Sequence, residues 1–192
     1  NTKPVSQILN MTNGQLIGKN VQLSINVDDS NFSNYIFEYA MVGNIINPVW
    51  TKILTGNSKG QFATTFDSSG LTGLYQFRVR AIDNSGNEAV DIRELIFDNQ
   101  PPEVQIIEPS NNIYTNQLFN LVGTVLDLDL HLQSANWSYK GPDDSQFIPI
   151  TTINNGNLFQ AEFNPISKNG EYIFKLIASD LAQNITEKSI MV

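Results

Sequence analysis

The sequence contains no cysteine and a single histidine, His131. Without thiols the chain has no disulfide framework, no thiolate nucleophile and no cysteine-ligated zinc. The nucleophile-elbow and phosphate-loop motifs are also absent. His131 lies beside Asp129 and near Ser134 in a segment that we interpret as a loop, and neighbours on one loop rarely supply a nucleophile, a base and an oxyanion hole together. The sequence therefore predicts that the protein is not an enzyme.

Positive charge is scarce as well. Eleven lysine and arginine residues face nineteen aspartate and glutamate residues, which gives a net charge of −8 and a pI near 4.5. The basic residues are scattered singly, so no local patch attracts a phosphate backbone or an anionic membrane. No apolar run approaches the roughly 20 residues that a membrane-spanning helix needs. We expect no nucleic-acid partner and no direct membrane insertion.

The remaining composition is that of a folded protein. Hydrophobic residues make up 41% of the chain and charged residues only 16%, a balance that supports packed cores and argues against disorder. Its 192 residues suit one large domain or two of about 100. The chain begins at Asn1 without a methionine or a charged-then-apolar leader, and we interpret it as a piece of a larger protein.

An internal repeat sets the domain organisation. Identical residues recur at a shift of 98 and then, after the loss of one residue, at a shift of 97. The first shift pairs Pro4/Pro102, Ile8/Ile106, Leu23/Leu121, Val27/Val125 and Gly43/Gly141, and the second pairs Ile53/Ile150, Phe62/Phe159, Gly73/Gly170, Phe77/Phe174 and Asn87/Asn184. The repeat predicts two domains of one kind, residues 1–98 and 99–192.

The periodicity within each copy is two. Residues 21–27 alternate between apolar and polar, as in a strand with one buried face, and turn-forming clusters at 67–70 and 84–87 separate such runs. The fold class is therefore all-β, with two tandem β-sandwiches of about seven strands each. The predicted strands are 5–9, 20–27, 35–42, 50–55, 61–66, 74–82 and 92–97, then 103–107, 118–126, 134–140, 146–153, 158–163, 171–179 and 186–192. The predicted core residues are Leu23, Tyr39, Phe77, Leu121, Trp137 and Phe174, with Tyr39 and Trp137 as partners in the third strand.

Four sequence features resemble a known family. They are the Pro101-Pro102 pair before the second copy, the first strand ending in Ile106-Ile107-Glu108-Pro109, an aspartate after each second strand (Asp29 and Asp127), and the Y-x-F-x-V-x-A-x-D-x-x-G-N pattern from Tyr75 to Asn87. Together they resemble the tandem immunoglobulin-like repeats of bacterial and archaeal surface proteins, which implies two tandem immunoglobulin-like β-sandwich domains. The second copy departs from the pattern at Gln183, where the turn glycine is replaced, so its last turn is expected to differ.

The resemblance implies a place and a role. It points to a non-catalytic, extracellular structural or adhesive module of a larger cell-surface or secreted protein. Its partners would be neighbouring immunoglobulin-like domains of the same polypeptide, surface proteins or glycans. The alternative is a carbohydrate-binding accessory module of a secreted enzyme, since one fold serves many functions. Such a module needs exposed aromatic side chains: we interpret the repeat-equivalent Trp50 and Phe147 as core residues, and Phe32 and Tyr114 as the better candidates for exposed contacts.

Acidic residues suggest one metal site. Two loops at one end of the second copy would gather Asp127, Asp129 and Asp180 opposite Asp98 and Asn99 of the linker 97–102. Calcium prefers several carboxylate and amide oxygens at once, so these five residues form a candidate calcium site. The alternative is that water solvates each carboxylate separately.

Overall fold

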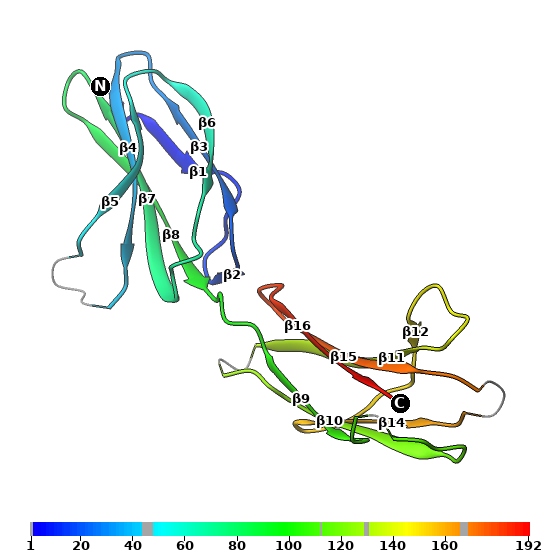
Figure 1. Cartoon of the computed structure of the whole chain (residues 1–192). Helices are drawn as coiled ribbons and strands as arrows, with labels where there is room; N and C mark the ends of the chain where they lie inside the picture. The colour runs from blue at the N-terminus through cyan, green and yellow to red at the C-terminus, as the bar shows by residue number, and fades with distance from the viewer. Residues whose placement is uncertain (1, 44–47, 112, 129–130, 166–168) are drawn as a thin grey trace. The chain divides into compact units, whose positions relative to one another are not determined.

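A computed structural model describes residues 2–43, 48–111, 113–128, 131–165 and 169–192. In this part of the chain all regular structure is β-strand, which confirms the all-β fold class. The chain divides into two compact units, Asn1–Asn99 (unit 1) and Gln100–Val192 (unit 2). Each unit is a sandwich of two sheets (Figure 1). Each sandwich has its own hydrophobic core.

Unit 1 packs a three-stranded sheet against a five-stranded sheet. The first has the order β1-β3-β6, with β1 Val5–Ile8, β3 Val21–Asp28 and β6 Gly60–Phe66. The second has the order β2-β8-β7-β4-β5, with β2 Gln15–Ile17, β8 Glu88–Phe97, β7 Gly73–Asp83, β4 Phe32–Met41 and β5 Thr51–Gly56. All neighbours are antiparallel except β2 and β8, which pair in parallel.

Strand β2 was not predicted. After β1 the chain leaves the first sheet, crosses the open side of the sandwich and joins the edge of the second sheet at Gln15. Gly14, with φ 75°, makes the turn that precedes β2 and donates its N–H to the Glu94 carbonyl at 2.8 Å. Three residues are too few to show a period of two, so the pattern could not reveal this strand.

Unit 2 has two four-stranded sheets. Their orders are β13-β14-β10-β9 and β12-β11-β15-β16. The strands are β9 Glu103–Glu108, β10 Phe119–Leu126, β11 Leu132–Lys140, β12 Ile148–Pro149, β13 Ile153–Asn155, β14 Leu158–Phe163, β15 Ile173–Asp180 and β16 Ile185–Met191. The single strand predicted at 146–153 is wrong: β12 pairs with β11 in one sheet and β13 with β14 in the other, because the chain changes sheets between them.

The predicted core is largely confirmed. Leu23, Leu121, Phe77, Phe174 and Trp137 are each at most 1% exposed. The sixth residue, Tyr39, is only partly buried; its ring stacks on Phe77 with 5.6 Å between the ring centroids. The alternation in β3 and β10 therefore assigns the correct faces to these strands.

The predicted partnership of Tyr39 with Trp137 is wrong. In unit 1 Phe37 lies opposite Val79, and Tyr39 lies opposite Phe77. In unit 2 Trp137 lies opposite Leu176, and Tyr139 lies opposite Phe174. Because Val79 and Leu176 are equivalent, Trp137 corresponds to Phe37 and Tyr139 to Tyr39. Equivalent residues of the third strand are thus 100 positions apart in the two copies, not 98. The difference of two residues lies in the connection before β11, which is longer than the one before β4.

Candidate functional sites

The last turn of each sandwich is clamped by an aspartate. In unit 1 the Asp83 carboxylate accepts hydrogen bonds from the Asn87 side chain at 2.6 Å, the Asn87 N–H at 2.8 Å and the Ser85 N–H at 2.8 Å. These bonds, with the Asn87 side chain contributing most, lower the pKa of Asp83 below its ordinary value. In unit 2 Asp180 accepts the same two bonds from Asn184, both at 2.8 Å. The turn is the same despite Gln183, which adopts φ 69° where Gly86 has φ 83°.

The predicted calcium ligands lie in both units. Asp180 is fully buried in the turn clamp, and Asp127 is 8% exposed at the end of β10. Asp98 is buried at the end of β8, and the Asn99 amide donates to the Ser68 and Leu71 carbonyls, both at 2.7 Å.

Asp129 lies outside the described residues. Within the described part of the chain no group of three or more histidine, cysteine, aspartate or glutamate residues could hold a metal ion. The junction site uses residues of both units and stays a prediction.

The outer face of the five-stranded sheet has an aromatic ring and a row of ion pairs between neighbouring strands. The Arg78 guanidinium lies 3.6 Å from the centroid of the Trp50 ring, and its Nε is 2.9 Å from Oε1 of Glu38. Arg80 pairs with both Glu38 and Glu88. The bond from Arg80 holds the pKa of Glu88 below its usual range. Glu38 is only 5% exposed although it lies on an outer face, because its neighbours cover it.

Unit 2 repeats a reduced form of this face. Lys175, equivalent to Arg78, places its Nζ 4.1 Å from the Phe147 ring centroid and 3.1 Å from Oε2 of Glu187. The prediction that Trp50 and Phe147 are core residues is therefore wrong: both lie on outer faces under a cation. A sequence signal for this arrangement existed, because both copies have a cation, Arg78 or Lys175, at the same outward-facing strand position.

The other two aromatic candidates differ from each other. Tyr114 is fully exposed, as expected of a contact residue. Phe32 is partly buried and packs against the core of unit 1, so it is a cap on the core.

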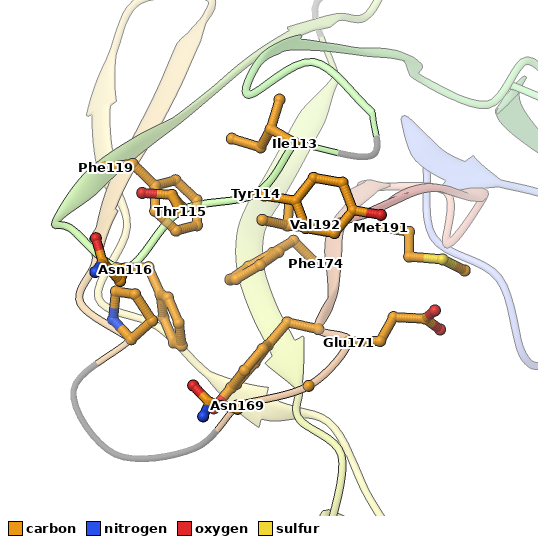
Figure 2. A pocket seen from close by; sticks show the side chains of 14 residues that line it. Ile113, Tyr114, Thr115, Asn116, Phe119, Asn169, Glu171, Phe174, Met191 and Val192 are labelled. Carbon is orange, nitrogen blue, oxygen red and sulfur yellow. The ribbon is translucent and has the colours of Figure 1, made fainter.

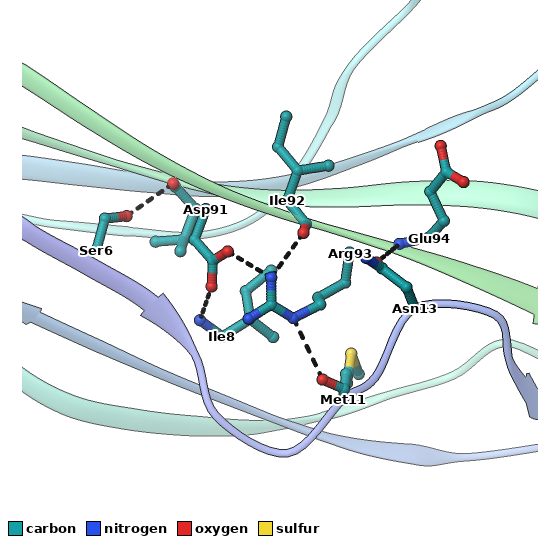
Figure 3. A network of polar contacts seen from close by, with 9 residues as sticks. Ser6, Ile8, Met11, Asn13, Asp91, Ile92, Arg93 and Glu94 are labelled. Atoms are coloured by element: carbon teal, nitrogen blue, oxygen red, sulfur yellow. Dashed lines mark hydrogen bonds and ion pairs between the residues drawn. The ribbon is translucent and has the colours of Figure 1, made fainter.

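An ion pair on β8 contacts the segment between β1 and β2, and no sequence pattern indicated it (Figure 3). Asp91 and Arg93 lie opposite Val79 and Phe77, on the inward side of β8. Asp91 accepts the Ile8 N–H at 2.8 Å and pairs with Arg93, whose Nε lies 3.3 Å from the Met11 carbonyl oxygen. The pair thus fixes the segment in which the chain crosses from β1 to β2.

Unit 2 contains a cavity of about 630 Å³ at one end of its sandwich (Figure 2). Its walls are mainly apolar and aromatic. They include Phe119, Phe163, Tyr172, Phe174, Met191 and Val192.

The sequence matches no protein-family model and no curated protein. Solved structures do match. A titin I-band fragment, I67–I69, is similar with a TM-score of 0.55 and 13% identity, over 99% of this chain and 65% of the fragment. An E-to-A variant of the same three titin domains gives 0.53 and 12%, over 98% and 64%. The chicken CNTN1 FN1–FN3 domains give 0.47 and 15%, over 100% and 67%. Both units are immunoglobulin-like sandwiches.

The two titin similarities establish the immunoglobulin-like fold, and identities this low do not extend to function. This chain spans about two thirds of the titin fragments. No helix in the described part of the chain has the length and apolar character needed to cross a membrane.

Proposed function

We propose that this chain is a non-catalytic structural or adhesive module of an extracellular protein, either anchored at the cell surface or secreted. The observation that carries the proposal is the repetition of one self-contained sandwich. Each unit has its own buried cluster of aromatic and aliphatic side chains, and the burial of this apolar surface stabilises each sandwich separately. Tandem domains of this kind extend a polypeptide and present surfaces along it.

The strand pairing of unit 1 supports a role under tension. Strand β2 lies near the start of unit 1 and β8 at its end, and the two pair in parallel from Gln15/Leu95 to Ile17/Phe97. When the ends of the unit are pulled apart, parallel strands slide along each other, so their hydrogen bonds are loaded together. Antiparallel terminal strands would open one bond at a time.

The surface chemistry supports the same role. On the outer face of unit 1, Arg78 and Arg80 are neutralised by Glu38 and Glu88 of the same face. A face that satisfies its own charges has little electrostatic pull on a charged substrate.

Labelling of intact cells tests the proposed location. Antibodies raised against the two units should stain unpermeabilised cells of the source organism or detect the protein in the medium. External protease should remove the cell-bound signal. Staining that appears only after permeabilisation would contradict an extracellular module.

A carbohydrate-binding accessory module is the second candidate, because Trp50 lies on an outer face. Arg78 occupies one side of the indole at 3.6 Å, so a sugar ring would stack on the other side. A glycan array probed with the whole chain, with Trp50→Ala, and with Phe147→Ala as the matched control in unit 2 separates the two functions. Glycan binding that only Trp50→Ala abolishes would favour this candidate over the structural one.

A further inference from the structure

Strand β6 is an unprotected sheet edge of unit 1. It pairs with β3 on one side, and no strand of the described structure pairs with its other side (Figure 1). Exposed edges are usually protected by charged residues, proline, bulges or a covering segment. The seven residues of β6 include no charge and no proline, and their register with β3 is regular. In unit 2 the equivalent strand, β14, contains Glu162 and is covered by β13.

The other edge strands of unit 1 have such protection. Strand β2 has only three residues and β1 only four, and the Asp91 carboxylate accepts the Ile8 N–H at the end of β1. Strand β5 contains Lys52, and its register shifts against β4. Among the edges of unit 1 that the structure describes, β6 is thus the one most open to pairing with another strand.

Alternate residues of β6 direct their backbone groups outward. The backbone of Ser24 faces β1, because its carbonyl accepts the Leu9 N–H at 2.8 Å. Successive residues of a strand direct their backbone groups to opposite sides, so Ile25 faces β6 and bonds to its partner there, Phe62. The N–H and C=O groups that point away from β3 therefore belong to the exposed residues Gln61, Ala63 and Thr65.

This edge is complementary to itself. When two β6 strands run antiparallel with their Ala63 residues opposite each other, Gln61 of each copy lies opposite Thr65 of the other. Each outward N–H then meets an outward carbonyl. The side chains that meet directly are two small alanines and two uncharged polar pairs, so no like charges face each other.

The charges that flank β6 fit the same register. Lys59 precedes the strand and Asp67 follows it, and both are exposed. They are equally far from Ala63, so Lys59 of each copy lies opposite Asp67 of the other. The Asp67 carboxylate is held at this end of β6, because its Oδ1 accepts the Ser69 N–H at 3.0 Å. Opposite charges thus meet at both ends of the paired strands.

We propose that β6 is a homodimer interface, at which the β6 strand of a second copy of this chain adds antiparallel about a two-fold axis at Ala63. The three-stranded sheets of the two copies then become one continuous sheet. Backbone hydrogen bonds supply the affinity, and the two Lys59–Asp67 pairs fix the register. The contact is closed, because each copy uses its β6 edge once.

Sedimentation of the whole chain tests this interface. The parent should form a dimer with a Kd between about 1 μM and 1 mM, because one strand pair buries less surface than a standard interface. Ala63→Pro removes an N–H that points away from β3, so it should abolish the dimer and leave unit 1 folded. Ala63→Lys should abolish it as well, because two cations then lie opposite each other.

The flanking charges have a matched control. Lys59→Glu places two carboxylates opposite each other at both ends and should weaken the dimer roughly tenfold or more. Lys52→Glu makes the same change in net charge on β5 and should leave the Kd within about twofold of the parent value.

Amide hydrogen exchange locates the contact. The N–H groups of Phe62 and Thr64 should be protected at every protein concentration, because they bond to β3, whereas those of Gln61, Ala63 and Thr65 should gain protection only as the dimer forms. A parent that stays monomeric at about 1 mM would overturn the proposal. A dimer that survives both Ala63→Pro and Ala63→Lys, or one in which the outward N–H groups exchange freely, would also overturn it, as would assembly beyond a dimer.

Discussion

The indole ring of Trp137 lies directly against the backbone of Gly123. A Cβ atom on this glycine would be 3.2 Å from Cζ2 of Trp137, 2.5 Å from a methyl group of Leu176 and 2.9 Å from the carbonyl oxygen of Gln105. The indole N–H donates to the Phe159 carbonyl at 2.9 Å, which fixes the ring in this position. The core of unit 2 is thus built around a large ring where the facing strand has no side chain.

Unit 1 fills the same space differently. Its equivalents of Gly123 and Trp137 are Ile25 and Phe37, and both are fully buried. The smaller ring of Phe37 leaves room for the isoleucine side chain. Unit 1 thus combines a larger aliphatic residue with a smaller ring, and unit 2 combines a glycine with a larger ring. Both combinations fill the space between the sheets.

The first prediction concerns this pair. Gly123→Ala should destabilise unit 2 by about 1–3 kcal/mol, because the new methyl group meets a backbone oxygen that cannot move freely. Urea unfolding followed by the fluorescence of Trp137, in a Trp50→Phe background, measures the change. Gly70→Ala in unit 1 is the control, since a Cβ there meets no atom within 4 Å, and it should leave the unfolding curve reported by Trp137 unchanged. Equal stabilities of the Gly123→Ala protein and its parent would show that the ring does not pack as described.

The second prediction concerns the shared aromatic cluster. Phe174 is fully buried, and its ring lies 4.8 Å from that of Phe163. Phe174→Ala should cost roughly 3–5 kcal/mol of the unfolding free energy of unit 2. Phe147→Ala, which removes a ring from the outer face, should cost much less. A loss under about 1 kcal/mol for Phe174→Ala would indicate a register error of one residue in β15, since such a slip exchanges the faces.

The strands were predictable where the alternation of apolar and polar residues continued over many residues. Residues 21–27 and their repeat equivalents show their buried faces directly, and these faces are confirmed. The third strand was misaligned because the repeat was followed through identical residues such as Gly43 and Gly141. The connection from β10 to β11 is two residues longer than that from β3 to β4, and this change of loop length leaves no periodic signal.

The surface was harder to predict than the core. An aromatic residue in both copies suggests burial, and for Trp50 and Phe147 this was wrong because Arg78 and Lys175 shield the rings. The inward-facing pair Asp91 and Arg93 breaks the alternation that predicts strand faces. It is tolerated because each side chain bonds to the crossing backbone.

The third prediction concerns acid stability. The folded-state pKa of Asp83 is below its ordinary value of about 3.9, so its contribution to the stability of unit 1 is present above that value and is lost as the pH falls through the lower folded pKa. Asp83→Asn should therefore be less stable than the parent at pH 7, and the difference should shrink towards pH 2. Thermal melts between pH 7 and pH 2 measure it. Asp28→Asn, which removes an exposed carboxylate, controls for net charge. A difference that is constant with pH would contradict the turn clamp.

The fourth prediction concerns calcium. Besides carboxylates, the proposed ligand set includes Asn99, whose Oδ1 atom is buried and has no hydrogen-bond partner in the described structure. Calorimetric titration of metal-free protein should show binding tighter than about 1 mM, a range found for extracellular calcium modules. Asp127→Asn should abolish the binding, and calcium should raise the melting temperature relative to chelator. The absence of heat together with an unchanged melt would contradict a calcium site at these residues.

The fifth prediction follows from the strands at the ends of each unit. Unit 1 joins β2 to β8 in parallel, whereas in unit 2 β9 and β16 belong to different sheets. Unit 1 should therefore resist a pulling force better than unit 2. The Ile17 carbonyl accepts the Asp98 N–H at 3.0 Å, so the N–H of Ile17 also faces β8. Ile17→Pro removes this N–H and should reduce the unfolding force of unit 1 alone.

Single-molecule stretching of the whole chain tests the proposed structural module most directly. Two separate ruptures are expected, each lengthening the chain by about 3.3–3.6 Å per unfolded residue, less the folded length of that unit. The weaker rupture should belong to unit 2, and the stronger one should move to lower force in Ile17→Pro. One concerted rupture of the whole chain, or a unit 1 that opens at the lower force, would contradict two self-contained sandwiches built to carry tension in series.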